Sequence, residues 1–122
     1  MARPNIIEVD PVELPDVDLV AKMLRALGDP TRLRIVNLLM DGPLIQKQLI
    51  AEVGVSQGQV SSHLACLVWC GLVDANRKGQ QVEYLIGDPR VVGVIDLATA
   101  ILERSGAGIA SCRRVDDPLR NI

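Results

Sequence analysis

The chain has 122 residues, enough for one domain with its own core and too few for two. Hydrophobic residues make up 48% of it and charged residues 23%, as in ordinary folded proteins. Its aromatic residues are only Trp69 and Tyr84, which argues against base stacking of the kind that single-strand nucleic-acid binders use. The sequence has no apolar run of membrane-spanning length and no signal-peptide core, so we expect a cytoplasmic protein with no membrane partner.

The distribution of charge is more informative than the net charge of −2. Residues 25–80 hold six basic and four acidic side chains, whereas the segments on either side are net acidic. A mildly basic middle permits contacts with phosphate groups without requiring them. A mixed, solvated surface explains this charge distribution equally well, so charge alone does not predict a nucleic-acid partner.

The chain order predicts an arm followed by short helices. Residues 1–15 carry three prolines and no period, and we expect an extended arm there. Asp16 is the expected cap of a first helix that ends at Gly28. Asp29-Pro30 starts a second helix, which runs to about Met40, and a third ends at Gly54.

A helix-turn-helix follows from the next segment. Gly54-Val55-Ser56 reads as a tight turn, and Ser56 with Gln59 forms a capping box that starts a helix over about 57–70. On this helix Val60, Leu64, Leu67 and Val68 form one apolar stripe, which we expect to face the core.

The rest of the sequence predicts a wing and a dimerisation helix. Two stretches with Gly79 at the bend, the second of them alternating, indicate a β-hairpin with a basic tip. Asp88-Pro89 starts a last helix, over about 89–104, that is apolar nearly all round and therefore needs a partner chain. We expect a mainly α, homodimeric winged helix-turn-helix, with a folded domain over 16–104 and a tail over 105–122.

Short polar and amide side chains occupy the exposed start of the predicted reading helix. Such groups suit base edges and phosphates in a major groove of double-stranded operator DNA, although they could also be only solvated or capping residues. A phosphate contact or packing is favoured over metal ligation for the single histidine. The predicted DNA-binding residues are Ser56, Gln57, Gln59, Ser61, Ser62, His63, Arg77 and Lys78.

Several motifs together resemble the ArsR/SmtB family. They are Asp29-Pro30-Thr31-Arg32-Leu33-Arg34-Ile35, Ser56-Gln57, Ser61-Ser62-His63-Leu64, Gly71-Leu72-Val73 and the hairpin at Gly79. The resemblance covers residues 17–104 and implies a winged-helix dimer that represses transcription and leaves DNA when metal binds. It also implies that the protein is not an enzyme.

The cysteines predict a metal site. Cys66 and Cys70 are four residues apart on one helix, with Cβ atoms about 5–6 Å apart, so two thiolates can converge on one cation. Cys112 would supply a third thiolate, in cis or from the other protomer. Three sulfurs leave the tetrahedral preference of zinc unmet and suit cadmium, lead, mercury or trivalent arsenic better.

Comparison with the metal sites of the family narrows the choice of metal ion. The segment before the turn, residues 45–51, lacks the cysteines of the family's arsenic site, and Asp96 and Glu103 lack the histidines of its zinc site. Cys66, Cys70 and Cys112 match instead an actinobacterial subclass that senses cadmium and lead, which implies Cd(II) or Pb(II) as the inducer.

The same residues are compatible with other functions. A repressor on the same fold could sense oxidants or persulfides through the two thiols. A thiol-redox enzyme is disfavoured, because no Cys-x-x-Cys motif is present and no basic residue is adjacent in sequence to Cys66 or Cys70. A metal buffer would not need a wing.

Overall fold

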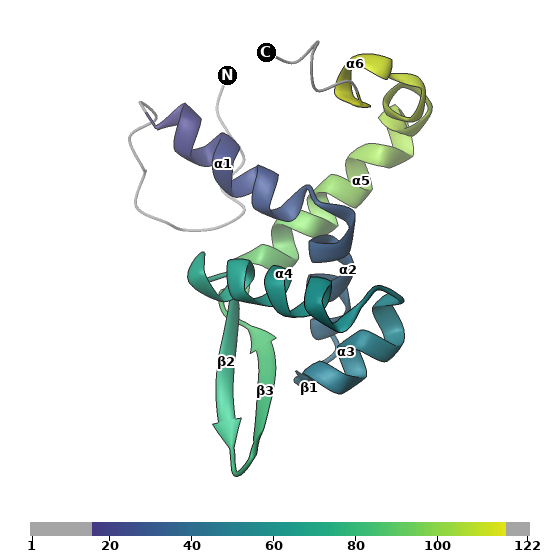
Figure 1. Ribbon diagram of the computed structural model, residues 1–122. Helices are drawn as coiled ribbons and strands as arrows, with labels where there is room; N and C mark the ends of the chain where they lie inside the picture. The colour runs from purple at the N-terminus through teal and green to yellow at the C-terminus, as the bar shows by residue number, and fades with distance from the viewer. Residues whose placement is uncertain (1–15, 117–122) are drawn as a thin grey trace.

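The computed structural model describes residues 16–116, and they form a mainly helical fold with one small sheet (Figure 1). The predicted arm over 1–15 and the end of the predicted tail lie outside this range. The elements are α1 (Val17–Leu27), α2 (Pro30–Leu39), β1 (Leu44–Ile45), α3 (Gln46–Val53), α4 (Gln57–Trp69), β2 (Val73–Lys78), β3 (Gln81–Ile86), α5 (Arg90–Ser111) and α6 (Arg113–Asp116). This is the predicted winged helix-turn-helix.

Local capping signals set the starts of α2 and α4. The Asp29 carboxylate accepts hydrogen bonds from the backbone N–H groups of Thr31 and Arg32, at 2.9 and 3.0 Å. Ser56 and Gln59 form the predicted reciprocal capping box of α4. Asp16 differs, since it stands at the N-cap of α1 but its side chain makes no capping bond.

The wing is an antiparallel hairpin of β2 and β3, with Gly79 at φ 63° in its turn. The backbone there is left-handed, a conformation that glycine adopts without steric cost. A third strand, β1, was not predicted and pairs Leu44 with Tyr84, so that the strand order is β1-β3-β2. This pairing joins the wing to the helix-turn-helix.

The core lies where α2, α3 and α4 meet the start of the wing. Ile35, Leu49 and Leu67 are among its fully buried side chains, together with Val60 and Leu64 from α4. Val68 was expected in this core but is 36% exposed. It falls at the edge of the apolar stripe, beside the open end of the hairpin sheet, where it lines a surface cavity with Ala75 and Tyr84.

The last helix is longer than predicted. It continues through Gly106 and Gly108 to Ser111, so residues 105–111 belong to the helix and not to a polar tail. Each glycine costs a helix about 1 kcal/mol relative to alanine, but Ala107, Ile109 and Ala110 between and after them sustain it. Cys112 caps this helix, and the short α6 follows.

Two helices leave apolar faces uncovered in the single chain. Val91 is the only residue of α5 that is buried within the described part of the protein, and α1 buries only Ala26 and Leu27. Leu24, Leu97 and Ile101 are each about half exposed. Figure 1 shows α1 and α5 projecting above the helix-turn-helix, away from the wing.

Gly87 lies in close contact with the end of α4. A Cβ atom at this position would lie 2.6 Å from the Gly71 carbonyl oxygen and 3.1 Å from the Asp74 carboxylate. We expect Gly87→Ala to lower the free energy of unfolding by about 1–3 kcal/mol, because the clash is with backbone. Gly58→Ala is the control, since nothing lies within 4 Å of its Cβ position on α4. Urea unfolding that shows equal stability for both variants would refute the contact.

Candidate DNA-reading helix and thiol site

The polar start of α4 is exposed, but several of its side chains already have partners. The Gln59 side chain accepts from the backbone N–H of Ser56 at 3.2 Å, and the Gln46 amide donates to the Ser61 hydroxyl. Gln57 and Ser62 are exposed and have no side-chain hydrogen bond in the described residues. The structure therefore leaves these two freest to contact a base edge.

His63 is turned into the protein, toward the start of α2. Its Nδ1 lies 3.3 Å from an Arg32 guanidinium nitrogen, and its Nε2 lies 3.9 Å from an Asp29 oxygen. Arg32 also donates to the carbonyl oxygens of Ala26, at 2.6 Å, and Arg25, at 3.2 Å, at the end of α1. Arg32 thus connects the C-terminus of α1 to α4 through His63.

Asp29 supports this connection, and its pKa is lowered. The largest cause is the hydrogen bond from the backbone of Arg32, and the charges of His63 and Arg32 and the Thr31 N–H act in the same direction against desolvation. A lowered folded pKa means that the stabilisation is complete above the ordinary value of 3.8 and is lost as the pH falls through the folded value.

We therefore expect Asp29→Ala to cost about 1 kcal/mol of stability at neutral pH, the usual price of a lost N-cap. The difference from the unsubstituted protein should shrink as the pH falls below about 3.8. Asp16→Ala is the matched control, because Asp16 holds the same position on α1 without a capping bond. Thermal unfolding across a pH series measures both. An equal loss for the two variants would contradict the capping role.

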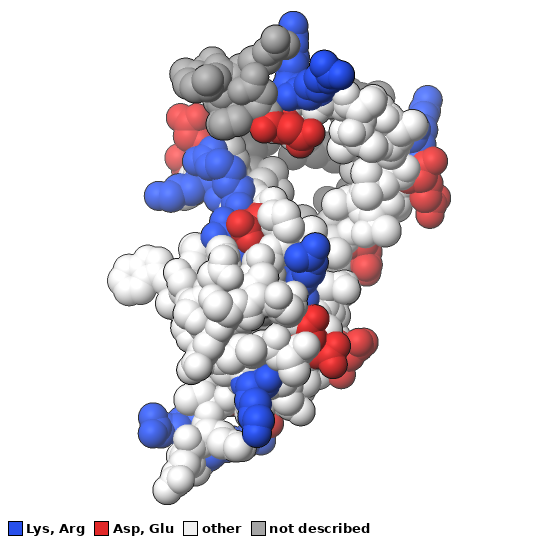
Figure 2. Space-filling model, turned by 45° about the vertical axis from the view of Figure 1, so that its right-hand side comes forward, with Lys and Arg blue, Asp and Glu red and all other residues white. Residues whose placement is uncertain are grey.

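The wing carries Arg77 and Lys78 at the end of β2. Both side chains are exposed, but the Lys78 ammonium lies 3.0 Å from a Glu83 oxygen on β3, whereas Arg77 has no ion pair among residues 16–116. Figure 2 shows basic side chains at the lower end of the molecule, where the hairpin of Figure 1 lies. Arg77 is thus the wing cation better placed for a phosphate contact.

Cys66 lies in the last turn of α4 and Cys70 is the C-cap residue that follows it, and both are free thiols. Burial raises the pKa of the Cys70 thiol, and the charge of Cys66 and a hydrogen bond with it add to that shift. Cys70 lies one helical turn after Cys66, and its backbone N–H donates to the Cys66 carbonyl oxygen at 3.0 Å. Cys66 is half-buried and Cys70 is exposed.

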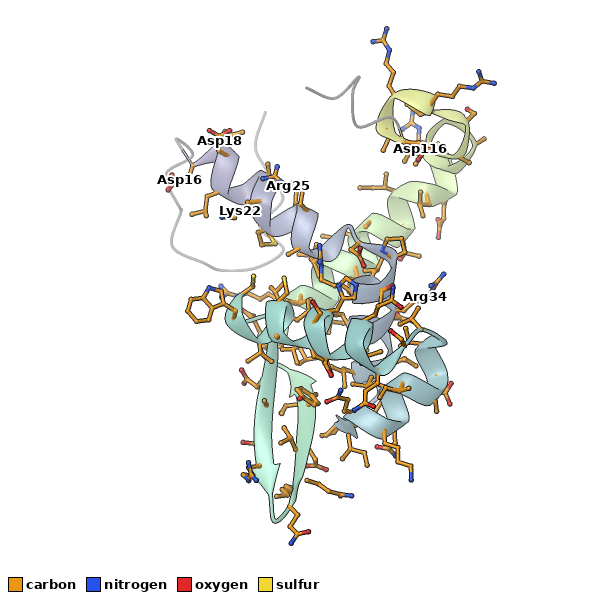
Figure 3. The ribbon with its side chains drawn as sticks, viewed as in Figure 1. Asp16, Asp18, Lys22, Arg25, Arg34 and Asp116 are labelled. Carbon is orange, nitrogen blue, oxygen red and sulfur yellow. The ribbon has the colours of Figure 1, made fainter. Side chains whose placement is uncertain are left out.

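The fold brings two basic residues near the cysteine pair, although no basic residue is adjacent to either cysteine in the sequence. The charges of Arg32 and Lys22 both act to lower the pKa of Cys70, against the larger raising effects. Lys22, together with Leu19, Met23 and Trp69, lines a cavity of about 430 Å³ that Cys70 borders. Figure 3 labels Lys22 on α1, the helix that lies above α4. A contact between α1 and α4 is non-local, so no sequence spacing could reveal it.

The third cysteine does not join the pair within one chain. Cys112 is half-buried at the far end of α5, which extends away from α4 (Figure 1). Among residues 16–116, no three His, Cys, Asp or Glu side chains lie close enough to hold a metal ion together. One chain therefore provides two thiols of the predicted three.

Comparison with known proteins agrees with the fold and the motifs. Residues 29–75 match the model of the arsR family of bacterial regulatory proteins. A probable mercury resistance operon repressor of Streptomyces lividans is 39% identical over 80% of this chain and 78% of its own. The chain belongs to the ArsR family. ArsR proteins are DNA-binding transcriptional regulators and not enzymes.

Two further similarities refine the comparison. The transcriptional regulator CmtR of Mycobacterium tuberculosis is 48% identical over 57% of this chain and 58% of its own length. The homodimeric winged helix-turn-helix domain Mb0332 of Mycobacterium bovis superposes with a TM-score of 0.66 at 26% identity, over 79% of this chain and 91% of that one. Within residues 16–116 of this ArsR protein, none of the helices combines the length and the apolar character that crossing a bilayer requires.

Proposed function

We propose that this ArsR protein is a cytoplasmic, homodimeric repressor that releases operator DNA when a soft metal ion binds three thiolates. Cys66 and Cys70 come from one protomer and Cys112 from the other. The observation that supports the proposal is that Cys66 and Cys70 lie one turn apart at the C-terminal end of α4, the helix whose start exposes Gln57 and Ser62. DNA would thus bind at the N-terminal end of α4 and the metal ion at its C-terminal end.

The uncovered apolar faces support the dimer. Between α1, α2 and α5 runs a groove of about 270 Å³, lined by Leu24, Leu33, Ile95 and Leu102 among other apolar residues. Together with the exposed faces of α1 and α5 it forms a surface that a second copy can cover by the same patch, as a two-fold dimer requires. The related Mb0332 domain is homodimeric.

A dimer also supports the assignment of Cys112 to the partner site. Its own chain holds it at the end of a 22-residue helix, apart from the Cys66–Cys70 pair. Pairing of α1 and α5 with the same helices of a second copy would bring each α5 terminus toward the partner's α1 and α4. The two thiolates of one protomer and the one of the other then make a three-sulfur site.

The donor set favours cadmium or lead as the inducer. Soft thiolates select soft cations, and a three-sulfur site does not satisfy zinc. The family resemblance to cadmium- and lead-sensing members points the same way, and mercury and trivalent arsenic fit the same donors. The relative from S. lividans is named for mercury resistance.

Release of DNA follows from the position of the site. A metal that draws the partner's Cys112 onto the end of α4 would re-aim that helix and change the spacing of the two reading helices in the dimer. Since half-sites lie at fixed separation, altered spacing weakens binding. A coupling of about 1–3 kcal/mol corresponds to roughly 5- to 150-fold. Arg32 and His63 provide a second route, because they join the same helix to α1.

A titration tests the proposal. The dimer, kept reduced and bound to its own promoter fragment, is titrated with cadmium, lead, zinc and arsenite. Fluorescence anisotropy follows DNA, and ultraviolet absorbance follows thiolate–metal bonds. We expect release at one cadmium or lead per protomer, with zinc much weaker. Release by oxidant or persulfide alone would favour a thiol-redox sensor instead.

A further inference from the structure

A methionine and an exposed cysteine line one cavity of the same chain. Met23 of α1 and Cys70 at the end of α4 both line the cavity of about 430 Å³, with Leu19, Lys22 and Trp69. Met23 is 38% exposed and Trp69 is 92% exposed, so the cavity opens to solvent. A small ion can therefore reach it without any movement of the core.

Three sulfur-bearing side chains of one protomer belong to this region. Cys66 lies one turn before Cys70 at the end of α4, and Cys70 lines the same cavity as Met23 of α1. Figure 3 shows sulfur atoms, drawn yellow, in the space between α1 and α4. Two of these sulfurs are ionisable and the third is a neutral thioether.

This donor set suits a monovalent ion better than a divalent one. Thiolate and thioether ligands together select Cu(I) and similar soft monovalent cations. On binding, the two thiols release their protons to solvent, and two thiolates with one monovalent cation leave a net charge of −1. The Lys22 ammonium, at the wall of the same cavity, offsets that charge. A divalent ion gains more from a third thiolate than from a neutral thioether.

We infer that Cys66, Cys70 and Met23 of a single protomer form a binding site for Cu(I) or Ag(I) that does not need Cys112. The site shares its two cysteines with the proposed cadmium and lead sensor, and it rests on that proposal only for this pair. Binding there would compete with cadmium or lead, because both ions use the same two thiolates.

Transfer of Cu(I) from its bicinchoninate complex, followed by loss of the complex's visible colour, tests this inference. The full-length Cys112→Ser protein should take up one Cu(I) per protomer. Met23→Leu in that background should lower Cu(I) affinity by about 10- to 100-fold, at least the range that loss of an outer-shell partner costs. Leucine keeps the size and apolar character of the side chain, so the variant should fold.

Met40→Leu is the matched control, since Met40 lines a different cavity, with Leu39 and Pro43. Its Cu(I) affinity should equal that of the parent. Equal affinity for Met23→Leu and Met40→Leu would overturn the thioether ligand, and no uptake by Cys112→Ser would overturn the one-protomer site. Neither result touches the cadmium and lead proposal, which fails instead if the unsubstituted dimer does not release DNA with those ions.

Discussion

Cys112→Ser is expected to leave operator affinity unchanged and to abolish nearly all of the metal-induced release. The expected loss is from roughly 5- to 150-fold weakening of DNA binding by cadmium or lead to almost none. Cys112 lies at the end of α5, far from the side chains at the start of α4, so its hydroxyl analogue should not disturb DNA reading. The remaining two thiolates can still bind a soft ion, but they cannot draw the two protomers together.

Ser111→Ala is the control for this experiment. The Ser111 hydroxyl donates only to carbonyl oxygens of its own helix, at Ala107 and Gly108, so its loss tests the end of α5 without removing a thiol. We expect it to respond to metal like the unsubstituted protein. Full release of Cys112→Ser by cadmium or lead, measured by anisotropy on the same promoter fragment, would sink the three-thiolate model.

Leu67→Ala is expected to have the largest effect on stability. Leu67 is fully buried on α4, next to Cys66, and belongs to the core that α4 shares with α2 and the start of the wing. Removing its isobutyl group leaves a cavity and should lower the free energy of unfolding by about 2–5 kcal/mol. Because α4 carries both the proposed DNA-contacting residues and two of the proposed thiolate ligands, operator affinity should fall as well.

Val68→Ala is its matched control. Val68 is the next residue of the same helix, yet it is 36% exposed, so its loss should cost well under half as much. Both variants are compared by urea unfolding at one fixed protein concentration, because the stability of a dimer depends on concentration. A larger loss for Val68→Ala than for Leu67→Ala would mean that the side of α4 facing the core has been misassigned.

Much of the fold could be predicted because its signals are local. Asp29 followed by proline and Ser56 followed by Gln59 specify helix starts within four residues, and Gly79 specifies the hairpin turn. Each was confirmed. Asp16 has the same chemistry as Asp29, but its backbone at φ −91° and ψ 42° does not adopt the extended conformation of a cap.

The features that sequence reasoning missed depend on distant contacts or on context. The two-residue β1 exists only because it pairs with β3, about 40 residues later. The helix passes through Gly106 and Gly108 because neighbouring helix formers outweigh their cost.

In the candidate site, too, some features follow from local spacing and others depend on contacts between distant elements. The spacing of Cys66 and Cys70 was enough to predict that they lie one turn apart at the end of α4. The proximity of Lys22, Met23 and Arg32 to the pair depends on how α1 and α2 pack on α4, and no pattern in the sequence encodes it. The inward orientation of His63 likewise follows from the packing of α2.

A mixed dimer tests the central claim most directly. One protomer carries Cys66→Ser with Cys70→Ser and keeps Cys112, and the other carries only Cys112→Ser. If the site is shared between protomers, the mixed dimer holds one intact set of three thiols, although neither chain holds one by itself. Native mass spectrometry and thiolate–metal absorbance should then find one cadmium per mixed dimer in a three-thiolate site. A mixed dimer with no three-thiolate cadmium would contradict the account.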